Sequence, residues 1–157
     1  MTPEVYTVTQ ALEKATKYCA YQERCQQEVR QKLTSFQLTS NQIEEVIAEL
    51  IQQNYLNEER FSEAYARGKF RMKSWGKKKI TLALRQKEIS EYCIKKGMLQ
   101  IEDTEYITAL NTVLEKNYLK YAGIQDYQRA AKTAQYAIGR GFESSLVWQQ
   151  LKNFTND

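Results

Sequence analysis

The chain has 157 residues and a formal net charge of +4, with 42% hydrophobic and 27% charged residues, one proline, six glycines and no histidine. So few loop-forming residues favour a soluble helical protein. The absence of histidine excludes most catalysis and metal binding that depends on an imidazole.

The first third of the chain is predicted to form three helices. Apolar residues recur at helical spacing over residues 8–19 and 29–36, and the clearest stripe runs over residues 43–51. Thr39 followed by Gln42 predicts a capping box at the start of the third helix.

The middle third is predicted to begin with an N-cap at Asn57, because two glutamates follow it in the first turn. We expect this helix to bury a face formed by Phe61, Ala64, Tyr65, Gly68 and Met72. After Gly76, a further helix carries Ile80 and Leu84 on its apolar side.

Helical spacing continues to the end of the chain. Apolar stripes cover residues 107–114, then Tyr127 to Ile138, and a last amphipathic stretch covers residues 147–154. A period of two is nowhere sustained, so no strand is expected. A loop is expected around Gly123.

The chain also matches itself at an offset of 51 and then 53 residues. Leu33, for example, falls on Leu84 and then on Ala137. We therefore predict an all-α fold of three tandem three-helix repeats that form an elongated, curved body. The expected units are residues 5–55, 56–102 and 103–157.

Positive charge is concentrated in residues 67–96, which carry eleven Lys or Arg and two Asp or Glu. Lys77 to Lys79 open a predicted helix, where cations oppose the helix dipole and where free N–H groups would suit a phosphate. The segment predicts a negatively charged partner, with a plain solvated basic face as the alternative. The candidate partner-binding residues are Arg67, Arg71, Lys73, Trp75, Lys77, Lys78, Lys79 and Arg85.

Trp75 aligns with Arg24 and Gln128 in the other two copies, which favours exposure at this position. A tryptophan beside lysines can stack on a base or anchor a protein interface, and the alternative is a space-filling core residue. Trp148 lacks basic surroundings, and packing or an interface is expected there.

No catalytic site is expected, because the chain has no nucleotide-binding or nucleophile motif. The three cysteines lack CxxC spacing, so we expect reduced thiols in a cytoplasmic protein without a metal or a cofactor. No run of apolar residues is long enough to predict a membrane span.

Several short motifs occur in a fixed order along the chain. They are Glu23-Arg24, Glu28-Val29 and Leu33, then Tyr55-Leu56-Asn57-Glu58-Glu59-Arg60-Phe61, Ala64-Tyr65, Trp75-Gly76, Ile80, Leu84 and Ile89, and finally Arg140-Gly141-Phe142. In this order they resemble the RecX family of bacterial recombination regulators over residues 10–155. Cys25, Asn57 and Lys87-Glu88 depart from the family pattern near predicted helix ends.

The resemblance implies a monomeric, non-enzymatic modulator of DNA repair, homologous recombination and the SOS response. Such a protein would bind the RecA recombinase filament, within its helical groove, and limit filament growth or activity. The basic segment suits either RecA or the single-stranded DNA of that filament. Two alternatives remain: a nonspecific nucleic-acid binder or helix-turn-helix regulator unrelated to recombination, and a purely structural helical-repeat adaptor.

Overall fold

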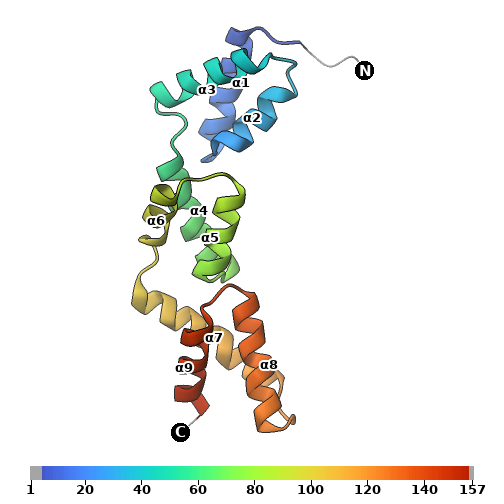
Figure 1. Ribbon diagram of the computed structural model, residues 1–157, viewed down its shortest axis with the longest axis vertical. Helices are drawn as coiled ribbons and strands as arrows, with labels where there is room; N and C mark the ends of the chain where they lie inside the picture. Colours follow the sequence, from blue (N-terminus) through green and yellow to red (C-terminus); the bar gives the residue numbers. More distant parts are fainter. Residues whose placement is uncertain (1–4, 156–157) are drawn as a thin grey trace.

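The computed structural model describes residues 5–155, and within this range the chain forms nine helices and no strand. In chain order the helices are α1 (Val8–Tyr21), α2 (Gln26–Thr34), α3 (Ser40–Gln52), α4 (Glu58–Lys73), α5 (Lys77–Gln86), α6 (Glu91–Met98), α7 (Asp103–Lys120), α8 (Asp126–Gly139) and α9 (Ser144–Thr155). They form three successive three-helix units along the longest axis of the molecule (Figure 1). This confirms the predicted all-α three-repeat fold. The expected third unit ends at residue 157, and its last two residues lie outside the described range.

The helices begin where local sequence places their caps. At the start of α3, the Thr39 hydroxyl accepts from the Gln42 N–H at 3.2 Å, and Gln42 Oε1 accepts from the Thr39 N–H at 2.9 Å. At the start of α4, Asn57 Oδ1 accepts from the Arg60 N–H at 3.0 Å. Both caps satisfy backbone donors that have no partner within the helix, so both predicted helix starts are confirmed.

The first unit has its own hydrophobic core, whereas the second and third units share one continuous core. One position that the internal repeat relates is buried in all three copies, where it is occupied by Leu33, Leu84 and Ala137. The shared core also takes in Cys25 from the first unit. The three units are therefore joined by packing as well as by the chain.

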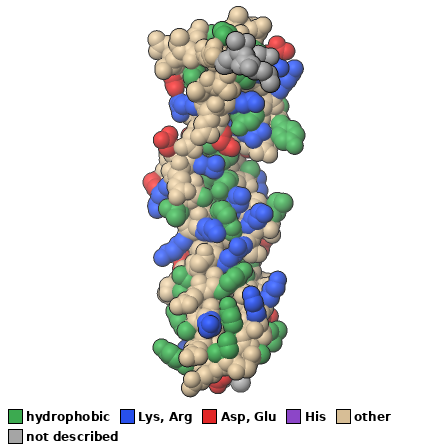
Figure 2. Space-filling view, turned by 90° about the vertical axis from the view of Figure 1, so that its right-hand side faces the viewer, with side chains coloured by type: hydrophobic (Ala, Val, Ile, Leu, Met, Phe, Trp, Pro, Cys, Tyr) green, Lys and Arg blue, Asp and Glu red, His purple; other side chains and the backbone are tan. Residues whose placement is uncertain are grey.

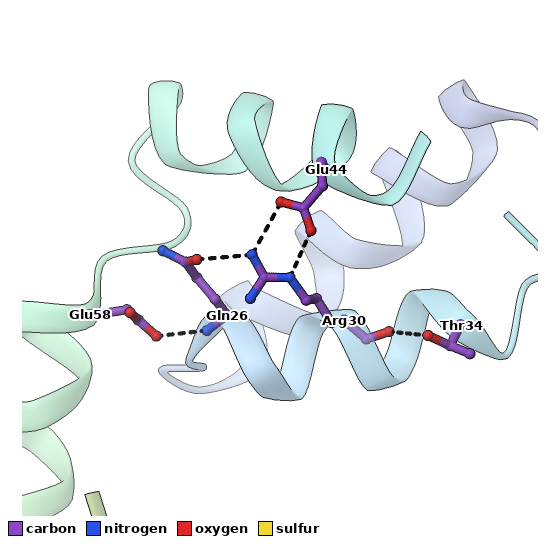
Figure 3. A network of polar contacts seen from close by, with 5 residues as sticks. All are labelled: Gln26, Arg30, Thr34, Glu44 and Glu58. Atoms are coloured by element: carbon purple, nitrogen blue, oxygen red, sulfur yellow. Dashed lines mark hydrogen bonds and ion pairs between the residues drawn. The ribbon is translucent and has the colours of Figure 1, made fainter. Parts of the chain in front are cut away.

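Polar contacts link the first and second units, and one of them is seen in Figure 3. Glu58, at the start of α4, accepts a hydrogen bond from the backbone N–H of Gln26 at 2.9 Å and so caps α2 of the preceding unit. Within the first unit, Arg30 forms an ion pair with Glu44, with 2.8 Å between Nε and Oε1. A second link across the joint pairs the Arg60 guanidinium with Glu23 at 2.5 Å.

The predicted buried face of α4 is partly wrong. Phe61 is buried, but Met72 is 83% exposed, and the inward positions belong to Ser62, Ala66 and Phe70. The interior accepts the polar Ser62 because its hydroxyl donates to the carbonyl of Glu58 at 2.8 Å.

A close helix contact explains which face of α4 turns inward. A Cβ atom added to Gly97 of α6 would lie 2.8 Å from the carbonyl oxygen of Ser62. Small residues on both helices thus let α4 and α6 approach closely at this point. That approach leaves Ala64, Tyr65 and Gly68 only half-buried and Met72 open to solvent.

Candidate partner-binding surface

The turn between α4 and α5 is fixed by the backbone of the third unit. The Gly76 N–H donates to the carbonyl of Arg140 at 2.8 Å, and the Lys78 N–H donates to the carbonyl of Gly141 at 3.0 Å. Gly141 has φ +101°, and a Cβ on Gly76 would lie 2.2 Å from its carbonyl carbon. Only glycine fits at Gly76, so the turn that carries Trp75 is held in one position.

A buried tyrosine supports the same turn. The backbone N–H of Lys77 donates to the Tyr106 hydroxyl at 2.9 Å, and that hydroxyl donates to the carboxylate of Glu143. Burial, together with the hydrogen bond to Glu143, raises the pKa of Tyr106 above its ordinary value.

These contacts contradict the expectation of free N–H groups at the start of α5. The N–H groups of Lys77 and Lys78 are both used within the chain. An anion at this position would have to be recognised by side chains rather than by the helix N-terminus.

Five side chains on one side of α4 and α5 alternate between lysine and aromatic, and we call them the cation–aromatic ladder. Trp75 is partly buried against the core, and the Nζ atoms of Lys79 and Lys69 lie 4.6 Å and 5.0 Å from the centroid of its ring. Lys69 Nζ also lies 5.5 Å from the Tyr65 ring, and Lys87 Nζ lies 5.9 Å from that same ring. Such cation–π contacts hold the lysines along the surface. Trp75 thus both packs against the core and positions two cations.

Two of the predicted residues on α4 point away from the ladder. Arg67 donates to the side chain of Gln100 at 2.9 Å, and Arg71 pairs with Glu105 at 3.3 Å. Residues two apart on a helix point about 200° from each other. Arg67 and Arg71 therefore lie on the opposite side of α4 from Lys69.

Two more predicted cations are paired within the chain. Lys77 Nζ lies 3.8 Å from a carboxylate oxygen of Asp103, and Arg85 pairs with Glu91 at 2.7 Å. Lys73 and Lys78 are exposed and form no ion pair with any residue from 5 to 155. Of the predicted set, only Trp75 and Lys79 join the ladder, so the structure divides the basic segment over several surfaces.

The ladder borders a shallow groove of about 240 Å³ on the exposed side of α4. The groove is lined by Ala64, Tyr65, Gly68, Lys69, Met72 and Lys73. A glycine inside a helix costs about 1 kcal/mol relative to alanine, yet a Cβ on Gly68 would meet nothing within 4 Å. Packing among the described residues therefore gives no reason for a glycine there.

The surface of the molecule shows the same combination of charge and apolar character. Figure 2 shows Lys and Arg side chains interleaved with hydrophobic ones over the middle of one face. Charged groups around an apolar patch are typical of protein interfaces.

The internal repeat contained a signal for Lys69, which the predicted site omits. The 51-residue offset places Tyr18 on Lys69 and Arg24 on Trp75. In the first unit the Arg24 guanidinium lies 3.8 Å from the centroid of the Tyr18 ring. The same corner therefore holds a cation–aromatic pair in both units, with the two roles exchanged. Tyr65 and Lys87 carry no comparable signal.

Comparison with known proteins gives consistent matches over most of the chain. Three family models match in order: the first three-helix domain of RecX over residues 11–50, the second over 57–98 and the third over 103–151. The regulatory protein RecX of Prosthecochloris aestuarii is 30% identical over 142 residues, which cover 90% of this chain and 91% of that protein. That of Mannheimia succiniciproducens is 27% identical and covers 95% of this chain and 97% of its own length.

The chain spans only 53% of the RecX protein of Lactobacillus gasseri, to which it is 26% identical. Among solved structures, RecX from Lactobacillus salivarius superposes with a TM-score of 0.84 at 24% identity, and the match covers 93% of this chain and 95% of that one. This likeness supports the fold. Among the helices in residues 5–155, none is both long enough and apolar enough to span a bilayer.

Proposed function

This chain belongs to the RecX family, and from that membership we propose that it binds the filament formed by RecA recombinase on single-stranded DNA. Binding limits the ATP hydrolysis and strand-exchange activity of RecA. The protein acts in the cytoplasm by occupancy as a monomer and not as an enzyme.

The cation–aromatic ladder is the observation that carries this proposal. Lys69 and Lys79 have no carboxylate partner within residues 5–155, and their contacts to Trp75 hold them in place before any partner arrives. Cations held in this way attract an acidic surface and raise the rate of encounter. Their fixed geometry lowers the entropy lost on binding.

The groove beside the ladder favours the recombinase over the DNA as the partner of this surface. Met72 and Gly68 form an apolar, closely approachable strip next to lysines. Aromatic and methionine side chains surrounded by charged groups are typical of a surface that binds another protein through an apolar centre and a polar rim. We therefore assign the ladder and its groove, together with exposed Lys73 and Lys78, to an acidic face of RecA.

The test is a double charge reversal, Lys69→Glu with Lys79→Glu. The matched control reverses Lys14 and Lys152, which are exposed on α1 and α9 and give the same change in net charge. Each variant is titrated into preformed RecA filaments on single-stranded DNA while ATP hydrolysis is followed. Each ion pair lost with an acidic face is worth about 0.2–1 kcal/mol, and each reversed charge also repels that face. The ladder variant should therefore need an about tenfold higher concentration for half-inhibition, and the control should match the wild type.

Circular dichroism of both variants shows whether the helices are intact. Equal inhibition by the ladder variant and the control would remove the ladder from the contact. A wild-type protein that leaves RecA hydrolysis unchanged at every concentration would refute the proposed function.

A further inference from the structure

A second and larger cleft lies between the C-terminal end of α4 and the helices α7 and α8, which form the lower end of the molecule in Figure 1. Its volume is about 600 Å³, and its polar lining includes Ser74, Thr112, Lys116, Lys120, Tyr136 and Arg140. At Ser74 and Thr112 it continues into a hollow of about 320 Å³ along α7, whose lining includes the ion pair of Arg71 and Glu105. Together they form an extended groove in the third unit.

The larger cleft has three cations and no carboxylate in its lining. Lys116 and Lys120 are exposed, lie one turn apart on α7, and form no ion pair in the described part of the chain. The guanidinium of Arg140 donates to the carbonyl of Lys73 and is thereby fixed at the wall of the cleft. The cleft is positively charged, and this charge lies outside residues 67–96.

Two hydroxyl groups at the cleft are free to bind a ligand. The side chains of Ser74 and Tyr136 line it, and neither hydroxyl forms a hydrogen bond with another residue between 5 and 155. Tyr136 is 43% exposed, so its ring is also accessible. Lysine, arginine, serine and tyrosine are the side chains that contact phosphate oxygens in nucleic-acid complexes, and an exposed aromatic ring can stack on an unpaired base.

We propose that this cleft binds the sugar–phosphate backbone of single-stranded DNA. The third unit then holds the nucleic acid while the ladder on the second unit contacts the recombinase. A polynucleotide fits better than an acidic protein segment, because the cleft is lined by hydroxyls and cations and continues as a groove along α7. The location of the strand in a RecA filament rests on the proposed function, but binding of the bare strand does not.

The experiment measures binding of the full chain to a fluorescein-labelled oligothymidylate by fluorescence anisotropy over a series of salt concentrations. Lys116→Gln with Lys120→Gln removes two phosphate contacts, and Lys14→Gln with Lys152→Gln is the matched control. For the cleft variant we expect an about tenfold loss of affinity and a salt slope smaller by about 1.4, since each phosphate contact on a single strand contributes about 0.7. The control should keep both values.

Three outcomes would overturn the proposal: no binding of the oligonucleotide by the wild type, an unchanged affinity and salt slope in the cleft variant, or equal binding of polyglutamate at the same salt. The last would identify an acidic protein segment as the occupant.

The ladder variant distinguishes this proposal from the proposed function. Lys69→Glu with Lys79→Glu should show the about tenfold weaker inhibition of RecA while it keeps most of its affinity for the oligonucleotide. If the cleft variant binds the strand normally while the ladder variant inhibits RecA about tenfold less well, the cleft proposal is wrong and the proposed function stands.

Discussion

Replacement of Gly76 by alanine should strongly destabilise the protein. The added Cβ would lie 2.2 Å from the carbonyl carbon of Gly141 and from the nitrogen of Phe142, and these backbone atoms cannot rotate away. Overpacking of this kind costs about 1–3 kcal/mol. If the two backbone segments move apart, the hydrogen bonds from Gly76 to Arg140 and from Lys78 to Gly141 also weaken. Each of these bonds is worth about 0.5–1.5 kcal/mol. We expect a total loss of about 2–6 kcal/mol in the free energy of unfolding, a large part of the stability of a typical domain.

Urea unfolding followed by circular dichroism measures this loss as a lower transition midpoint. Gly68→Ala is the matched control, because its Cβ meets nothing within 4 Å. That control should raise the midpoint, since alanine stabilises a helix interior by about 1 kcal/mol relative to glycine. An unfolding curve of Gly76→Ala that coincides with that of the wild type would refute the close backbone contact.

Two further predictions concern buried groups. Tyr106→Phe removes the hydroxyl that links Lys77 to Glu143 and should lower the free energy of unfolding by about 1–3 kcal/mol; urea unfolding checks this, and an unchanged midpoint would contradict it. Burial raises the pKa of the Cys19 and Cys25 thiols to about 11, so at about pH 8 only about 0.1% of each is thiolate. Ellman's reagent should then react rapidly with one thiol of the folded protein, the half-buried Cys93, and with all three after unfolding; three rapid equivalents in the folded state would refute this.

The fold was predictable because its determinants are local or repeat at a fixed offset. A capping box needs only Thr39 and Gln42, which are three residues apart. The repeat at offsets of 51 and 53 selects Leu33, Leu84 and Ala137, and all three are fully buried. Neither inference requires knowledge of which helices are neighbours.

The buried face of α4 could not be chosen in this way. Both stripes of this helix have helical spacing, and the more apolar one turned out to be half-buried over most of its length and open to solvent at Met72. The choice is made by the close contact of Ser62 with Gly97, which lies on another helix. The predicted stripe on α8 has the same weakness, since Tyr127 is 83% exposed.

The basic segment was found, but the division of its cations was not. Arg71, Lys77 and Arg85 are all paired with acidic residues that lie between positions 91 and 105. Of these acids, Glu91 lies near the end of the basic segment, and Asp103 and Glu105 lie beyond it. Arg85 and Glu91 meet across a short turn, whereas the partners of Arg71 and Lys77 are brought close only by the folding of α7 back to this surface. Charge counts along the chain therefore overestimate the free positive charge.

The motifs Trp75-Gly76 and Arg140-Gly141-Phe142 lie far apart in the sequence but form one contact in the structure. The turn at this contact presents Trp75 to the ladder and Ser74 to the proposed phosphate cleft. Gly76 therefore fixes the two surfaces relative to each other.

If the ladder binds the recombinase while the cleft binds the DNA, the fixed distance between the two surfaces contributes to affinity. Once one surface is bound, the other is already held close to its partner. A Gly76→Ala protein that remains folded at low temperature should then inhibit RecA less well than the wild type while it binds the oligonucleotide alone with unchanged affinity. Full inhibition by this folded variant would show that the two surfaces act independently.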